Sequence, residues 1–168
     1  MTVGWLPVST LRMTKTLFTV ADRQAWLAVL AHAPRAGLAE KAEHFVSAHR
    51  FDWLREPETG LALVRARIAN RGDRFNLGEV TVTRCIARVS VGKHTTAGVG
   101  HVLGRDEQRA RWVAQFDALL QQPSLHAQLL AEVVAPLTAA REAALDQEQA
   151  RHAASRVSFY TLQSEATA

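Results

Sequence analysis

Arginine side chains stand between glycines and strand-forming residues along residues 72–106, and Arg65 and Arg67 precede this stretch. Glycine allows a backbone to approach a ligand or a partner closely. The planar guanidinium group donates paired hydrogen bonds to phosphate or carboxylate groups. The residues of this kind that we single out are Arg65, Arg67, Arg74, Arg84, Gly104 and Arg105. They predict a surface that binds an anion or an acidic partner.

Two pairs of arginines fall on predicted strands. Arg65 and Arg67 share one face of a strand expected at residues 61–68, where they form a cationic ridge about 7 Å long. Arg84 and Arg88 form a similar pair on the next strand, and the register decides whether all four share a face. Such a face contacts phosphate or a partner's carboxylates, or it is a solvated face paired with nearby Glu and Asp. The sequence leaves both interpretations open.

The glycines of residues 98–104 resemble a dinucleotide-binding fingerprint, but Leu103 stands where the third glycine belongs. No doubly wound βαβ unit surrounds them, so we reject this motif. What remains is a strand that runs into a helix at Gly104, Arg105 and Asp106. The start of that helix holds an anion, or Asp106 caps the helix itself. The residues favour neither alternative.

No catalytic set can be assigned from the sequence. His101, which stands among glycines near Arg105, and Asp106 are candidates for general acid or base chemistry. The seven histidines include no pair at the helical spacing of metal ligands, so we predict no metal site.

The bulk composition limits the classes of function. The formal charge is +4, but 16 acidic residues are mixed among 20 basic ones. A nucleic-acid-binding protein usually has a denser basic stripe with interleaved aromatics, so a stand-alone nucleic-acid-binding module is only our alternative prediction. Cys85 is expected to be a buried hydrophobe, and a single cysteine indicates a reducing compartment. No stretch has the roughly 18 apolar residues that a transmembrane helix needs.

Periodicity predicts an α+β domain with antiparallel strands, since the connections between strands are short. A pair of helices is expected at residues 22–33, capped by Asp22, and at 38–48. Four strands are expected at residues 51–55, 61–68, 80–91 and 97–103. Three helices are expected next: one capped by Asp106 that ends at residue 122, one at 125–134, and an Ala-rich one at 136–153. A short terminal strand is expected at 157–162.

We expect residues 22–162 to form one domain and 163–168 a tail. We interpret residues 1–21 as a disordered leader or an over-extended start, with Met13 as an alternative initiator. The Ala-rich helix has a narrow apolar stripe, which is typical of an arm that lies on another subunit. The interface candidates there and beyond are Arg141, Ser155, Arg156, Phe159 and Tyr160.

Several short motifs carry a family resemblance in their order and spacing. They are residues 23–31 (Arg-Gln-Ala-Trp-Leu-Ala-Val-Leu-Ala), 58–61 (Glu-Thr-Gly-Leu), 65–67 (Arg-Ala-Arg), 74–75 with 78–79, 83–84, 102–106 (Val-Leu-Gly-Arg-Asp), 135–137 (Ala-Pro-Leu), and 155–157 with Phe159. From residue 22 to about 162 the chain resembles PhnG, the G subunit family of the bacterial carbon–phosphorus lyase core complex. Residues 1–21 depart from the pattern.

This resemblance implies a cytoplasmic protein of phosphonate catabolism in a hetero-oligomer with the H, I and J subunits, without nucleic acid or membrane as partner. The implied reaction is a transfer in which a phosphonate displaces adenine from the ribose of MgATP, giving α-D-ribose 1-alkylphosphonate 5-triphosphate. MgATP is the substrate of the complex, and no cofactor is expected on this chain alone. The family implies nucleosidase-like chemistry in the I subunit. We therefore expect a structural or substrate-positioning subunit that is inactive alone.

Overall fold

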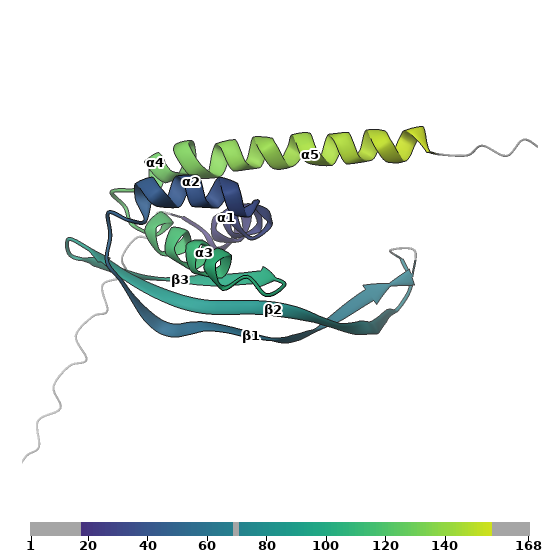
Figure 1. Ribbon diagram of the computed structural model, residues 1–168, viewed down its shortest axis with the longest axis horizontal. Helices are drawn as coiled ribbons and strands as arrows, with labels where there is room; N and C mark the ends of the chain where they lie inside the picture. The colour runs from purple at the N-terminus through teal and green to yellow at the C-terminus, as the bar shows by residue number, and fades with distance from the viewer. Residues whose placement is uncertain (1–17, 69–70, 156–168) are drawn as a thin grey trace, which may run out of the picture.

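A computed structural model describes residues 18–68 and 71–155 as a layer of helices on one face of an antiparallel sheet (Figure 1). The strands follow the order β1-β2-β3. In chain order the elements are α1 Val20–His32, α2 Arg35–Phe45, β1 Phe51–Arg67, β2 Arg74–Val91, β3 His94–Leu103, α3 Glu107–Leu120, α4 His126–Leu129, the π-helical segment Leu130–Val134 and α5 Ala135–Ala154. The predicted α+β class is confirmed.

The prediction of four strands is wrong, because the first two are one continuous strand, β1. Pro57 falls between the strands predicted at residues 51–55 and 61–68. It lies instead within β1, between register irregularities at Trp53/Arg55 and Arg55/Glu58. β1 is an edge strand, and an edge or a bulge is where a sheet tolerates a proline that donates no hydrogen bond.

The other two strands begin earlier than predicted, β2 at Arg74 and β3 at His94. Val64 pairs with Gly78, whereas Arg65 pairs with Asn76, so Leu77 is an extra residue in β2. Because the bulge absorbs one extra residue, strand pairing continues through a glycine-containing segment that is typical of a loop. The terminal strand predicted at 157–162 lies outside the described residues.

The helices agree with the periodicity, with corrections at two caps. Thr19, rather than Asp22, caps α1, and Asp22 completes a capping box by accepting from the Thr19 backbone. α2 begins at Arg35, three residues before the prediction, because Pro34 supplies an extended N-cap. Asp106 caps α3 as predicted, and Pro136 lies in the first turn of α5.

The core lies between the sheet and α3. The α3 side chains of Val113, Phe116, Leu119 and Leu120 are fully buried, as is Cys85 on β2. Trp26 and Leu30 of α1 and Leu38 of α2 pack into the same cluster. Among the helices of residues 18–68 and 71–155, none is both long and apolar enough to cross a membrane.

Two glycines of the residue 98–104 motif bring α3 against β3. A Cβ atom at Gly98 would lie 2.0 Å from the backbone oxygen of Ala114, and one at Gly100 would lie 2.1 Å from that of Ala110. These glycines therefore serve close contact between helix and strand, which is a physical reason for the motif without a nucleotide.

Candidate functional site

The outer half of the β1–β2 hairpin extends past α1, α2 and α3, in the same direction as the C-terminal end of α5 (Figure 1). Pairing of β2 with β3 ends at Val82 and Leu103, while β1 and β2 continue as a two-stranded ribbon from Leu61 with Thr81 to Arg67 with Arg74. We call residues 61–68 and 71–81 the hairpin arm.

The hairpin arm brings together three of the predicted anion-binding or partner-binding residues. Arg65 lies opposite Asn76, Arg67 lies opposite Arg74, and the Nη1 atom of Arg67 donates to the Gly72 backbone oxygen at 3.1 Å. Together with Ala66 the three arginines line an open hollow of about 470 Å³. Within the described part of the chain, none of them has a carboxylate within 4.0 Å.

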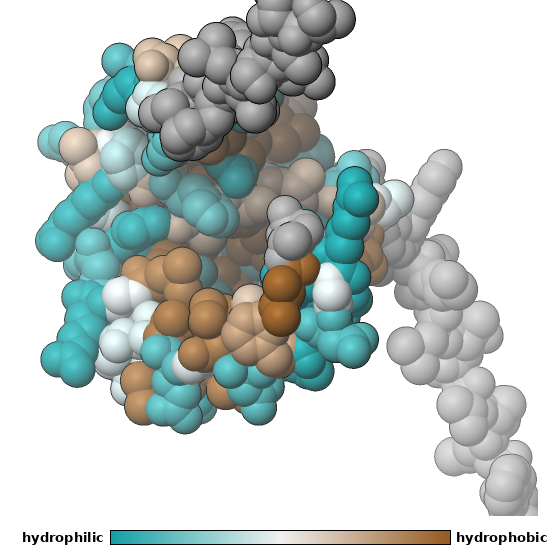
Figure 2. Space-filling view, turned by 90° about the vertical axis from the view of Figure 1, so that its right-hand side faces the viewer, coloured by the Kyte–Doolittle hydropathy of each residue, from teal (hydrophilic) through white to brown (hydrophobic). Residues whose placement is uncertain are grey.

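The hairpin arm also exposes large hydrophobic side chains. The exposed fractions are 67% for Leu61, 58% for Leu63, 71% for Ile68, 41% for Phe75 and 63% for Leu77. Figure 2 views the end of the molecule where the arm lies, and hydrophobic side chains gather in its lower half. An exposed apolar group of this kind is typical of an interaction surface.

Arg84 and Arg88 lie on the sheet near the helices and have carboxylate partners within the chain. Arg84 lies 2.6 Å from Glu58, which also contacts Arg55 at 2.7 Å, and Arg88 lies 3.0 Å from Asp52. The hydrogen bond from Arg84 is the main cause that lowers the pKa of Glu58. Strand alternation places Arg84 and Arg65 on opposite faces, so the four guanidinium groups do not share one.

The turn at residues 104–106 builds the start of α3. Gly104 has a φ of +91°, which favours glycine, and its N–H donates to the Thr81 backbone oxygen at 2.8 Å. Asp106 Oδ1 accepts a hydrogen bond from the Arg109 backbone N–H at 3.0 Å. Of the two alternatives, an anion site or a helix cap, the structure therefore shows the cap. Arg105 is exposed and lies outside the hairpin arm.

His101 is exposed on β3, where it pairs in register with Arg84. Within residues 18–68 and 71–155 no hydrogen bond connects its ring to another side chain, and no group of three potential metal ligands is found. A general base is normally oriented by a second group. The structure places no such group beside His101 among these residues.

Of the predicted interface residues, Arg141 and Ser155 fall within the described range. The Nη1 atom of Arg141 donates to the Ala28 backbone oxygen at 3.4 Å, across a groove of about 530 Å³ between α5 and the end of α1. Ser155 donates to the His152 backbone oxygen at the end of α5. Arg156, Phe159 and Tyr160 lie outside the described residues.

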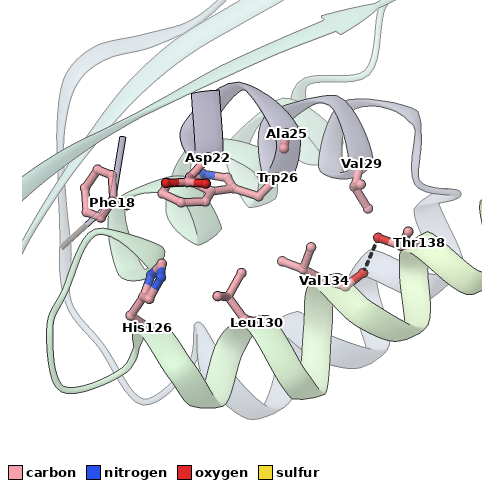
Figure 3. A pocket seen from close by; sticks show the side chains of 9 residues that line it. All are labelled: Phe18, Asp22, Ala25, Trp26, Val29, His126, Leu130, Val134 and Thr138. Carbon is pink, nitrogen blue, oxygen red and sulfur yellow. Dashed lines mark hydrogen bonds between the residues drawn. The ribbon is translucent and has the colours of Figure 1, made fainter. Parts of the chain in front are cut away.

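A second groove, of about 490 Å³, separates α1 from the segment that begins at α4 (Figure 3). The polar side chains that line this groove hydrogen-bond to backbone groups close to them in the sequence. His126 Nδ1 lies 2.6 Å from the Leu120 backbone oxygen, and Thr138 donates to the Val134 backbone oxygen. Asp22 belongs to the α1 capping box, and the Thr19 backbone N–H is the main cause that lowers its pKa. The groove is therefore an apolar surface, which sequence analysis did not predict.

Sequence analysis also missed Asp117, whose carboxylate is completely buried in α3. It accepts from Arg23 Nη2 at 2.6 Å, Trp26 Nε1 at 2.9 Å and the Val99 backbone N–H at 2.9 Å. These bonds connect α3 to α1 and β3. Asp117 is thus a structural carboxylate, and the signal for it was an acidic residue between two core positions of a predicted helix.

The fold and the site define an α+β protein with a projecting, arginine-bearing arm and, among its described residues, no assembled catalytic group. The chain belongs to the PhnG family: residues 21–164 match the family described as phosphonate metabolism protein PhnG. It is 40% identical over 144 residues to alpha-D-ribose 1-methylphosphonate 5-triphosphate synthase subunit PhnG of Rhizobium meliloti (strain 1021). The match covers 85% of this chain and 89% of that relative, and it confirms the predicted family.

Proposed function

We propose that this chain is a subunit of an α-D-ribose 1-methylphosphonate 5-triphosphate synthase, an enzyme of phosphonate catabolism. The observation that carries the proposal is the 40% identity to a subunit of that name over most of both chains. The match of residues 21–164 to a family described as phosphonate metabolism protein PhnG also supports it.

We further propose H, I and J subunits as its partners, MgATP as the substrate of the assembly and the cytoplasm as its location. These details come from the family resemblance. The proposed reaction is a transfer in which the phosphonate displaces adenine at the anomeric carbon of the ribose. Such displacements pass through an oxocarbenium-like state and depend on groups held in a fixed geometry.

The proposed role of this chain is structural or substrate-positioning. In the part of the chain that the structure describes, His101 has no orienting partner and Asp106 serves as a helix cap. The exposed arginines and leucines of the hairpin arm are suited to contact instead. We therefore expect no turnover by the chain alone.

The alternative of a stand-alone nucleic-acid-binding module is not supported, because the family match points to a synthase subunit. Arg84 and Arg88 are already paired with carboxylates of the chain. The exposed apolar side chains of the arm are mainly aliphatic, whereas nucleic-acid grooves rely on aromatic stacking.

The test is release of adenine from MgATP in the presence of methylphosphonate, measured for the co-purified H, I and J subunits with and without this chain. We expect release only when the chain is present, and none from the chain by itself. Equal rates with and without it would contradict the proposed function.

A further inference from the structure

We propose that the hairpin arm docks onto a partner protein whose surface has an apolar centre bordered by carboxylates. The inference rests on the proposed function, because it requires an assembly in which this chain is a subunit. It goes further by assigning the contact to one element and by stating the chemistry of the surface that receives it.

The charges of the arm differ from those of the rest of the sheet. Near the helices, arginines have internal partners, as in the Arg84–Glu58 and Arg88–Asp52 pairs. Arg65, Arg67 and Arg74 of the arm have no carboxylate within 4.0 Å among the described residues, and Arg67 lies directly opposite Arg74. Like charges opposite each other destabilise an antiparallel pair. Carboxylates from outside the chain remove this repulsion and bind guanidinium groups in a paired geometry.

An apolar stripe continues into this basic end. Leu61, Leu63, Arg65 and Arg67 occupy alternate positions of β1 and so share one face of the strand. The two leucines lie nearer the body, and the arginines lie nearer the tip. A receiving surface must therefore be apolar beside the leucines and acidic beside the tip.

The arm also needs support that the described chain does not provide. Beyond the end of β3 it is a ribbon of only two strands, and two-stranded ribbons are marginally stable in water. Burial of leucines that are 58–67% exposed stabilises such a ribbon in the assembled state. A small anion bound in the arginine hollow would leave these leucines exposed to water. A protein surface explains both the exposed leucines and the arginine hollow.

The test compares two arm variants in the assembly. In the first, Arg65, Arg67 and Arg74 are all replaced by Glu, with Arg50→Glu as a control, since Arg50 is exposed at the other end of β1. In the second, Leu61 and Leu63 are replaced by Ser, with Leu54→Ser as a control of similar exposure at 52%. Each tagged chain is co-expressed with the H, I and J subunits, and its ratio to them is measured after size exclusion.

We expect both arm variants to lower the recovered ratio more than tenfold in 0.15 M NaCl, and both controls to assemble like the unaltered chain. Salt distinguishes the two contributions, because 0.5 M NaCl screens the arginines but leaves the leucine contact. Circular dichroism of each variant checks that it is folded. If the Glu variant does not fold, replacement of the three arginines by Gln takes its place.

Normal assembly of both arm variants overturns the docking proposal and leaves the subunit function standing. Normal assembly with a raised KM for MgATP also overturns it, because the arm then binds the triphosphate. Failure of the unaltered chain to assemble overturns the proposed function and the docking proposal together.

Discussion

Asp117 organises the helix layer at the scale of single residues. Its buried carboxylate accepts hydrogen bonds from Arg23 and Trp26 of α1 and from the Val99 backbone of β3, two segments far apart in sequence. A buried charge is retained when it is paired and hydrogen-bonded. The carboxylate therefore fixes α1 and β3 relative to α3.

We expect Asp117→Ala to lower the free energy of unfolding by about 3–5 kcal/mol, because removal of one partner leaves buried donors unpaired. Urea unfolding of the purified chain measures the change. Asp146→Ala, at an exposed position of α5, is the control and should stay within about 0.5 kcal/mol of the unaltered chain. An Asp117→Ala variant as stable as this control contradicts the structural role.

Cys85 is predicted to be unreactive in the folded chain. Burial raises the pKa of its thiol to about 11, so the thiolate that reacts with disulfide reagents is scarce at pH 8. We expect labelling at least about 100-fold slower than that of an exposed cysteine, such as Ser90→Cys in a Cys85→Ala background. Complete labelling of native Cys85 within the control's reaction time would contradict this.

The same pKa has a consequence for stability. The unfolded thiol ionises near pH 8.5, whereas the folded thiol stays protonated up to about pH 11. The unfolded state therefore binds fewer protons between these values, and stability falls as pH rises through them. Cys85→Ala should reduce this fall, as measured by urea unfolding at pH 8 and pH 10.

The sequence predicts features that follow from local pattern better than contacts between residues that are far apart in the chain. It predicted Cys85 as a buried hydrophobe and Asp106 as a possible cap, because both follow from local pattern. It could not decide whether Arg84 was free, since its partner Glu58 is 26 residues away in sequence and meets it only through strand register. Asp117 was missed for the same reason, as its partners come from α1 and β3.

At the scale of elements, the contact between α3 and β3 depends on glycines. A Cβ atom at Gly98 would overlap the backbone of Ala114 and of Ala118. Backbone atoms cannot move aside as a flexible side chain can, so the helix itself must shift.

We expect Gly98→Ala to lower the free energy of unfolding by about 1–3 kcal/mol or more, as overpacking of a core does. Thermal or urea unfolding measures it. Gly60→Ala is the matched control, because a Cβ atom there has no neighbour within 4 Å. Equal stability of the two variants would show that α3 is not held closely against β3.

The helices could be predicted as elements because apolar spacing and capping residues are local signals. The strands could be predicted only in part. Pro57 and Gly78 are turn residues by propensity, yet bulges accommodate both within long strands. The length of the hairpin arm, and thus the grouping of Arg65, Arg67 and Arg74, was therefore beyond what sequence pattern could show.

At the scale of the whole molecule, two elements reach past the body in the same direction, the hairpin arm and the C-terminal end of α5 (Figure 1). Nearly all of the second half of α5 is exposed, and Leu145 on it is 44% exposed. Both elements therefore present surface that does not pack against the core of this chain. This shape agrees with the role of a subunit in an assembly.

The measurement that tests this account most directly is co-expression of the tagged chain with the H, I and J subunits, followed by size exclusion with mass determination. The account predicts a stoichiometric complex that persists in 0.5 M NaCl, because apolar contacts are not screened by salt. A chain that elutes alone and monomeric, while the other three subunits assemble without it, would contradict the account.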